Sequence, residues 1–143
     1  MRVYLCAAMT NADRRLADIT ALLAAVEAAG HQVPTRHVAA HNARELDLGL
    51  SDQELARRDL SWLEAADAVV AEVTTPAHGV GVEGTHAGHV GKPVFVIHRE
   101  GAVVSRLLTG LPGVRRGTYS TADDAAALAL AFLRELAPGV ARE

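Results

Sequence analysis

Two acidic residues, Asp59 and Glu83, occupy positions that suggest a chemical role for their carboxylates. Asp59 falls in the middle of an apolar stripe on a predicted helix, with Leu55 on one side and Trp62 on the other. A carboxylate on a buried helix face needs partners. The position therefore predicts either a buried ion pair or an acid that lines a cleft.

Glu83 belongs to the stretch "GVGVEG", which follows an apolar run and precedes a helix-like run. Gly79 and Gly81 predict a sharp backbone turn that exposes N–H groups. Glu83 is then expected in the first turn of the helix, where the helix dipole favours an ionised carboxylate. Such a group suits a nucleophile or the stabilisation of a cationic centre, although it also fits an acid that only stabilises its helix start.

Together, Asp59 and Glu83 fit the pair of carboxylates that cleaves a glycosidic bond. One acid attacks an oxocarbenium-like centre and the other assists the leaving group.

Two rival patterns, a dinucleotide fingerprint and a metal site, are weaker. The match of "GVGVEG" to the dinucleotide fingerprint G-x-G-x-x-G comes five residues after its strand and outside the first βαβ unit. His86 and His89 are three residues apart, whereas helical zinc sites favour a spacing of four, so we expect no metal.

Composition limits the partners. The chain has 143 residues, which fits one domain, and its net charge of −3 with no stripe of Lys or Arg argues against a nucleic-acid polymer. A single cysteine, Cys6, precludes an intrachain disulfide and fits a reducing compartment. No apolar run reaches membrane-spanning length or resembles a secretion signal. These features predict a cytoplasmic protein without membrane contacts.

The elements that must position the two acids alternate between strand and helix. Strands are expected at residues 2–8, 31–35, 67–73, 91–98 and 113–119. Helices are expected at 12–30 behind an Asn11 cap, at 51–66 behind a Ser51/Glu54 capping box, from the glycine stretch to about 90, briefly within 101–110, and at 122–137 behind Thr121. Residues 36–50 look irregular. This order predicts an α/β fold: a doubly wound, Rossmann-like or flavodoxin-like parallel sheet of five strands with helices on both faces.

Several stretches resemble one enzyme family. "YLC" in the first strand, "RHVA" after the second, "RDLSWLEAADAVVAEVTTPAHGVGVEG" and "GKPVFVIHR" are similar to the 2′-deoxynucleoside 5′-phosphate N-hydrolases, relatives of the nucleoside 2-deoxyribosyltransferases. The resemblance runs from about residue 3 to 110, and the segment from Asp59 to Glu83 is its most specific part. It implies one domain of this type over residues 1–143, no cofactor, and a homodimer with sites near the subunit interface.

The resemblance implies a role for each matching residue. Glu83 matches the nucleophile that forms a glycosyl ester, Asp59 matches the acid that assists the departing base, and Tyr4 matches a tyrosine beside the sugar. The remaining substrate-binding positions are His37, the phosphate-loop glycines Gly79 and Gly81, and Ser105, which is lent to the neighbouring subunit's phosphate site.

This chain departs from the family at its phosphate contacts. The family's Gly-Ser pair and arginine after "YLC" are replaced by Ala7, Ala8 and Thr10, and its phosphate-loop serine by Ala77. Charge-assisted contacts are the strong ones, so these losses weaken the expected grip on a 5′-phosphate. Thr10, Thr75 and His78 are the candidates to compensate.

The sequence therefore predicts an N-glycosidase of nucleotide metabolism that hydrolyses 2′-deoxynucleoside 5′-monophosphates to free base and sugar phosphate. Two alternatives stay open. A deoxyribosyltransferase would use a second base in place of water on the same intermediate, and a non-catalytic nucleotide-binding module would keep only the fold. The presence of both Asp59 and Glu83 argues against a pure binding module.

Overall fold

A computed structural model describes residues 1–137, and residues 138–143 of the predicted domain lie outside the described part. Its elements, in chain order, are β1 (Val3–Ala7), α1 (Leu16–Ala28), η1 (Arg36–Ala39, a 3₁₀ helix), α2 (Ala43–Asp47), α3 (Asp52–Glu64), β2 (Ala68–Glu72), α4 (His78–His89), β3 (Val94–Arg99), α5 (Arg106–Thr109), β4 (Val114–Tyr119) and α6 (Ala122–Leu136). Across residues 1–137, no helix is long and apolar enough to cross a membrane.

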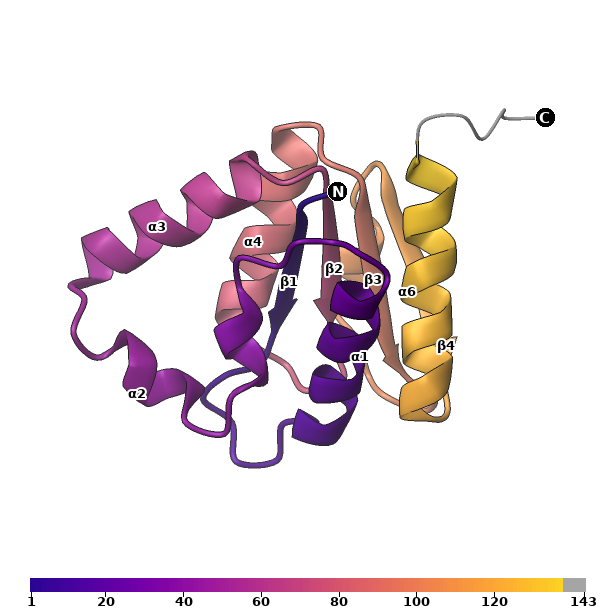
Figure 1. Cartoon of the computed structure of the whole chain (residues 1–143), viewed down its shortest axis with the longest axis horizontal. Helices are drawn as coiled ribbons and strands as arrows, with labels where there is room; N and C mark the ends of the chain where they lie inside the picture. Colours follow the sequence, from indigo (N-terminus) through magenta and orange to yellow (C-terminus); the bar gives the residue numbers. More distant parts are fainter. Residues whose placement is uncertain (138–143) are drawn as a thin grey trace.

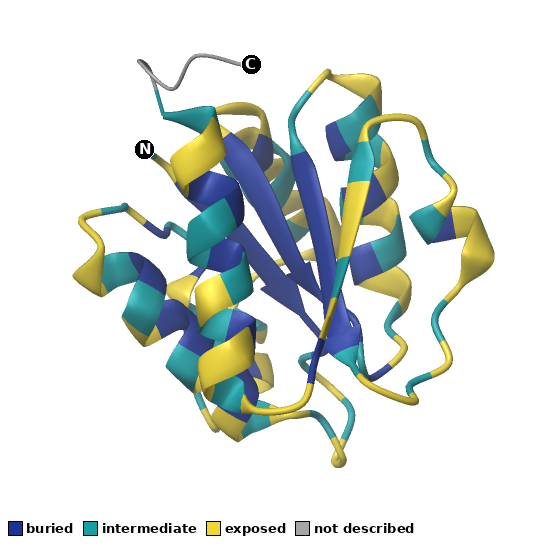
Figure 2. Ribbon diagram, turned by 90° about the vertical axis from the view of Figure 1, so that its right-hand side faces the viewer, coloured by how far each residue is buried: buried dark blue, intermediate teal, exposed yellow. Residues whose placement is uncertain are grey.

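The four strands form one parallel sheet in the order β1-β2-β3-β4. Their carboxyl ends point toward the bottom of Figure 1, where the loops after β1 and β2 lie. In strands β1 and β2 every residue is buried, whereas β4 is the partly exposed edge seen in Figure 2. Near-continuous apolar strands of this kind are typical of parallel sheets that are covered on both faces.

The expected fifth strand, at residues 31–35, is not formed. Only an isolated bridge joins Arg2 to Gln32. The prediction of five strands is therefore wrong, because the sheet has four. Pro34 has no N–H to donate to a ladder. One residue later, the Thr35 hydroxyl donates to the Leu5 carbonyl at 2.6 Å and accepts from the Leu5 N–H at 3.0 Å. A side chain thus satisfies the outer edge of β1 where a backbone strand was expected.

Two apolar cores lie on the two faces of the sheet, which confirms the prediction of helices on both sides. On one face, alternate β1 residues such as Val3 and Leu5 pack with side chains of α1 and α6. On the other, Tyr4 and Cys6 pack with side chains of α3, α4 and α5. Helices α1 and α6 lie in front of the sheet in Figure 1, while α2 and α3 extend to its left.

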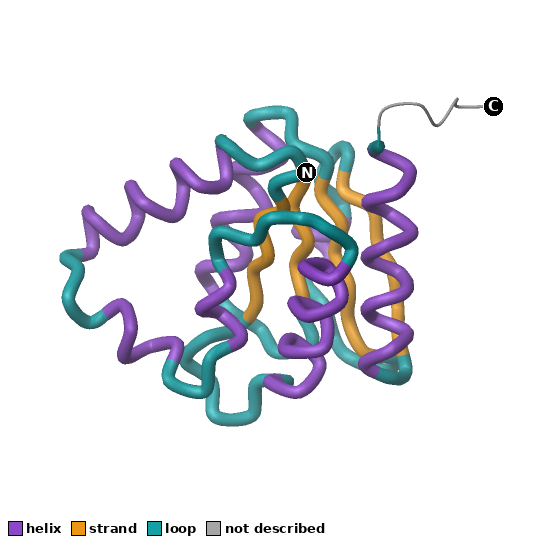
Figure 3. Tube along the Cα trace, in the orientation of Figure 1, coloured by secondary structure: helices purple, strands orange, loops and turns teal. Residues whose placement is uncertain are grey.

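Helix starts agree with the sequence where a capping box is present. Ser51 with Glu54 caps α3, and Thr121 with Asp124 caps α6. The predicted start of the first helix after Asn11 is wrong, because α1 begins at Leu16 and the Asn11 amide donates instead to the Pro76 carbonyl at 3.3 Å. Residues 8–15 therefore form a long loop at the carboxyl end of β1, drawn in teal in Figure 3.

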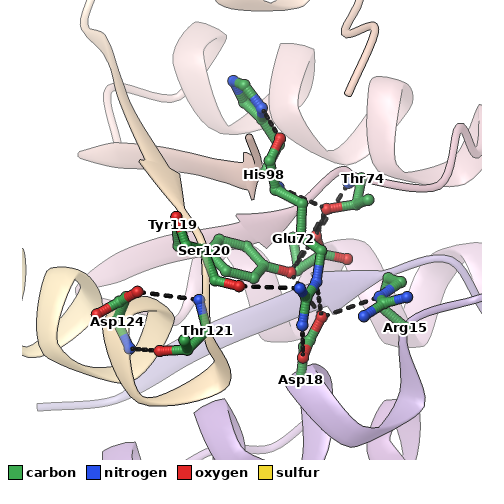
Figure 4. A network of polar contacts seen from close by, with 10 residues as sticks. Arg15, Asp18, Glu72, Thr74, His98, Tyr119, Ser120, Thr121 and Asp124 are labelled. Atoms are coloured by element: carbon green, nitrogen blue, oxygen red, sulfur yellow. Dashed lines mark hydrogen bonds and ion pairs between the residues drawn. The ribbon is translucent and has the colours of Figure 1, made fainter. Parts of the chain in front are cut away.

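A buried polar network joins the carboxyl ends of β2, β3 and β4 to α1 (Figure 4). The Tyr119 hydroxyl lies 3.1 Å from oxygens of both Asp18 and Glu72, and Thr74 donates to the same Glu72 oxygen. Arg99 donates to both oxygens of Asp18 at 2.8 Å, and these bonds lower the Asp18 pKa to about 2. The network fixes the carboxyl end of β2, from which the loop to α4 departs.

Candidate active site

A cavity of about 660 Å³ opens beyond the carboxyl end of β1. Parallel α/β sheets bind ligands at this edge, and the volume lies within the roughly 300–1,000 Å³ of small-molecule sites. The wall is built from the end of β1 and its loop, from the α2–α3 arm, and from the start of α4. Its chemically notable lining residues are Cys6, Thr10, Asn11, Arg44, Asp47, Asp52, Asp59, Ala77, His78, Gly79 and Glu83.

Glu83 lines this cavity, and Tyr4 lies behind it, outside the cavity lining. The Tyr4 side chain projects from β1 toward α4, is 1% exposed, and donates a hydrogen bond of 2.6 Å to Glu83 Oε1. Burial raises the Glu83 pKa to about 7, the negative charge of Asp59 adds to that rise, and hydrogen bonds from Tyr4 and Cys6 oppose it. The Tyr4 pKa is itself raised, first by burial and then by the Glu83 charge. The Tyr4 hydroxyl thus donates a hydrogen bond to a carboxyl group, Glu83, whose pKa is near neutrality.

The local geometry around Glu83 differs from the predicted turn. Gly79 and Gly81 lie inside α4 without positive φ angles, and Glu83 is the sixth residue of this helix, in its second turn. The dipole effect is confined to the first turn, so burial dominates and favours the neutral form. Gly84 has a packing role, because a Cβ there would lie 2.7 Å from Leu108 Cδ1. Gly79 and Gly81 have open space around them, so close packing explains only Gly84, and none of the three forms the strand-to-helix turn of a dinucleotide site.

Asp59 projects from α3 into the same cavity, and it does so as part of an ion pair. Arg58 Nε donates to Asp59 Oδ1 at 2.8 Å, and Arg58 Nη1 donates to Asp47 Oδ1 at 2.8 Å. The guanidinium lies 4.7 Å from the centre of the Trp62 ring, within cation–π range. The Asp59 carboxylate thus lines the cavity and is ion-paired at the same time, in a half-buried pair and not the buried one that the sequence offered as an alternative.

His37 stands behind this arrangement. Its Nε2 lies 3.8 Å from Asp47 Oδ2, and its ring centre lies 6.1 Å from that of Trp62. Burial lowers the His37 pKa, although the Asp47 charge acts in the opposite direction. The lining of this cavity of about 660 Å³, the candidate active site and called the catalytic cavity from here on, includes Asp47 and the neighbouring Val38, while His37 itself does not reach it. The structure therefore brings His37 beside the site through Asp47.

The predicted phosphate contacts divide between two hollows. Thr10, Ala77, His78 and Gly79 line the catalytic cavity. Ala8 is 1% exposed and does not line it, so this position supplies only a buried methyl group and a carbonyl.

Gly81 and Ser105 line a second hollow of about 780 Å³ between α4 and α5, together with the alternative phosphate contact Thr75. Ala77 and His78 border both hollows. Ser105 thus lies outside the catalytic cavity of its own chain.

Sequence reasoning missed four charged residues of the site: Arg44, Asp47 and Asp52, which line the cavity, and Arg58, which pairs with Asp47. Arg44 and Asp47 fall in the stretch expected to be irregular, which instead contains η1 and α2. Arg58 could have been found from its place next to Asp59 in the sequence, because a half-buried carboxylate predicts an adjacent cation. Within residues 1–137, no cluster of His, Cys, Asp or Glu side chains has the arrangement of a metal site.

Comparison with known proteins gives relatives of one kind. No model of a known protein family matches the chain. A protein named 2′-deoxynucleoside 5′-phosphate N-hydrolase 1, from Thermofilum pendens, is 36% identical over 129 residues, which cover 87% of this chain and 90% of that protein. The 5-hydroxymethyl-dUMP N-hydrolase of Rattus norvegicus is 35% identical over 112 residues, which cover 76% of this chain and 68% of that protein.

Solved structures share the fold. The CMP N-glycosidase of Clostridium botulinum has a TM-score of 0.67 at 21% identity, covering 92% of this chain and 99% of its own. A 2-deoxyribosyltransferase of Bacillus psychrosaccharolyticus has a TM-score of 0.63 at 17% identity, covering 88% of this chain and 90% of its own. At these identities the likeness concerns architecture.

Proposed function

This chain belongs to the 2′-deoxynucleoside 5′-phosphate N-hydrolase family, and we propose that it hydrolyses the N-glycosidic bond of 2′-deoxynucleoside 5′-monophosphates. The products are a free base and 2-deoxyribose 5-phosphate. The observation that carries the proposal is the Tyr4–Glu83 pair, with its 2.6 Å hydrogen bond, in a cavity that Asp59 also lines. One domain over residues 1–143 supplies this chemistry.

Glu83 acts as the nucleophile in two steps. Its carboxylate attacks C1′ of the sugar, the C1′–N bond breaks, and the bonding electron pair leaves with the base. Asp59 faces the departing base and assists it by hydrogen bonding or proton supply. Water then attacks C1′ of the glycosyl ester, the bond from C1′ to the Glu83 oxygen breaks, and Glu83 leaves as a carboxylate. The water proton passes to Asp59 where Asp59 has protonated the base, or otherwise to the departed base. Tyr4, which lies behind Glu83 and outside the cavity lining, holds the carboxylate in place and through that placement favours a 2′-deoxy substrate over a ribonucleotide.

The second chain of a homodimer completes the phosphate site. Val82, Val103 and Leu107 line the hollow between α4 and α5 and are 61%, 89% and 80% exposed. Large apolar side chains gathered around one hollow are typical of a protein–protein interface. Ser105 lines the same hollow, which supports its role as a contact lent to the partner's site.

A panel of ribo- and deoxyribonucleosides, with and without a 5′-phosphate, tests this function by quantifying the free base released. Glu83→Gln should lower turnover by several orders of magnitude while the fold persists. Absence of base release from every deoxynucleotide, or near-normal release by Glu83→Gln, would refute the proposal.

Deoxyribosyl transfer is the second candidate, because Ala8 and Ala77 leave the cavity with few side-chain donors for a phosphate. A foreign free base added to a deoxynucleoside distinguishes the two reactions. A new nucleoside among the products would indicate transfer, whereas hydrolysis yields only the original base and the sugar.

A further inference from the structure

We propose that Arg44 binds the 5′-phosphate of the substrate, in a subsite between the loop after β1 and helix α2. This inference rests on the proposed function, because it concerns the phosphorylated end of the same substrate. It assigns the cationic contact to a segment different from the one that the sequence suggested. Position 10, where the family's arginine is expected, holds a threonine in this chain.

The first argument is the continuity of the cavities. A polar cavity of about 330 Å³ lies between the loop after β1 and α2. It shares four lining residues with the catalytic cavity: Met9, Thr10, Asn11 and Arg44. A groove therefore extends from Glu83, past Thr10 and Asn11, to the guanidinium of Arg44. When C1′ of the sugar lies at Glu83, the base and the 5′-phosphate are the two groups left to fill the rest of this groove.

The second argument is charge. Among the described residues that line the catalytic cavity, Arg44 is the only arginine or lysine. Its side chain is exposed, and within residues 1–137 it makes no hydrogen bond or ion pair to another side chain. A guanidinium presents paired N–H donors that match phosphate oxygens, so Arg44 is available for a bidentate contact.

Arg14 lines the polar cavity but is already engaged. Its Nη1 donates to the carbonyls of Ala8 and Val38, at 3.3 and 2.7 Å, and its Nη2 donates to the carbonyl of Ala40. Arg14 thus joins the loop after β1 to η1 and places a fixed positive charge behind the subsite. Glu45 is the one acidic residue in the described lining of this polar cavity, against two arginines, so the balance favours an anion.

Thr10 and Asn11 form the opposite wall. The Asn11 amide donates to the Pro76 carbonyl at 3.3 Å, which holds this loop against the segment that precedes α4. The Thr10 hydroxyl lies 3.5 Å from Asn11 Oδ1, so it contacts that oxygen at the limit of hydrogen-bond distance and can turn toward a ligand. A phosphate between Thr10 and Arg44 would receive a hydroxyl donor from one wall and a guanidinium from the other.

Arg44→Gln tests the assignment, with Arg44→Lys as the conservative variant and Arg57→Gln as the matched control. Arg57 is an exposed arginine on α3 that lines none of the three cavities. For each protein, kcat/KM is measured on a deoxynucleoside 5′-monophosphate and on the same deoxynucleoside. Arg44→Gln should reduce the ratio of the two values roughly ten- to a hundredfold, because a hydrogen-bonded charge is lost. Arg44→Lys should keep part of the ratio, and Arg57→Gln should keep all of it.

Calorimetric titration with 2-deoxyribose 5-phosphate separates this proposal from the proposed function. The wild-type protein should bind this probe at least tenfold more tightly than Arg44→Gln does, whether or not base release is detected. Equal losses on nucleotide and nucleoside, or unchanged binding of the sugar phosphate by Arg44→Gln, would overturn the assignment of Arg44. Absence of base release with retained, Arg44-dependent binding would instead contradict the proposed hydrolysis alone.

Discussion

The Glu83 carboxyl group titrates at about 7 because burial outweighs the hydrogen bond that Tyr4 donates to it. The proposed attack on C1′ needs the carboxylate, so activity should depend on the loss of this proton. The acidic limb of the pH profile of kcat/KM reports such a group in the free enzyme. Below pH 7 the neutral form accumulates and kcat/KM should fall, whereas above pH 7 the carboxylate should dominate.

Tyr4→Phe should move that acidic limb to higher pH. The variant removes a donor that stabilises the carboxylate, so the Glu83 pKa should rise above 7 and kcat/KM at neutral pH should drop. The measurement is kcat/KM between pH 5 and 9 for the wild type and Tyr4→Phe. A limb that stays in place, or moves to lower pH, would mean that Tyr4 does not act through the ionisation of Glu83.

The same carboxyl group should cost stability at high pH. Its pKa rises from an ordinary value of 4.5 in the unfolded chain to about 7 in the folded protein, so the folded state binds the proton more tightly. The stabilisation by this proton is complete below pH 4.5 and lost as the pH rises through 7. Near pH 8 the deficit is about 3 kcal/mol.

Glu83→Gln should therefore raise the free energy of unfolding at pH 8, by up to about 3 kcal/mol. Glutamine resembles the neutral acid in shape and can still accept the Tyr4 hydrogen bond. Urea unfolding at pH 8 and at pH 4.5 measures the effect, and the advantage of the variant should vanish at the lower pH. A Glu83→Gln protein that is less stable than the wild type at pH 8 would contradict the cost attributed to this buried carboxyl group.

At the scale of elements, Arg58 connects two parts of the cavity wall. It holds Asp59 of α3 with one edge of its guanidinium and Asp47 of α2 with the other, while Trp62 lies against its face. Arg58 is thus a positioning residue, since it acts through Asp59 and through the α2 segment. Without it, two carboxylates on the cavity wall lose their common partner, and their mutual repulsion should displace α2.

Arg58→Gln should lower kcat roughly ten- to a hundredfold, the scale of a catalytic group displaced by about 1 Å. The loss should be largest for natural bases and smaller for substrates with activated leaving groups, because those need less help from Asp59. Arg57→Gln, on the exposed face of the same helix, is the control and should leave the rates unchanged. A loss that is equal for both classes of leaving group would assign Arg58 a purely structural role.

Which elements the sequence could predict follows from where their signals lie. The capping box at Ser51 and the cap at Thr121 are local signals, and both were predicted correctly. The edge of β1 was not, because the competition between a strand and the Thr35 side chain depends on the position of Leu5, thirty residues away. The surroundings of Glu83 were also missed. Its position in the second turn of α4 and its burial beside Tyr4 depend on tertiary packing, which the local sequence does not show.

At the scale of the whole molecule, the two hollows stand on either side of the segment before α4. The catalytic cavity contains Glu83, and the hollow between α4 and α5 contains Ser105 with its exposed apolar neighbours. If a second chain covers that hollow, as the proposed homodimer requires, burial of Leu107 and Val103 should drive association and carry Ser105 to the partner's phosphate. Leu107→Asp should then yield monomers, which sedimentation would detect.

Mixed dimers of two variants test whether Ser105 acts in the partner's site, which homodimers of either variant cannot show. Glu83→Gln homodimers should lack turnover, and Ser105→Ala homodimers should lose part of the preference for a 5′-phosphate. In a mixed dimer, one site combines an intact Glu83 with the intact Ser105 of the partner, so it should regain the wild-type preference. The measurement is the ratio of kcat/KM for nucleotide and nucleoside in an equimolar, re-equilibrated mixture. A ratio that stays at the Ser105→Ala value would show that each chain uses its own Ser105, or none.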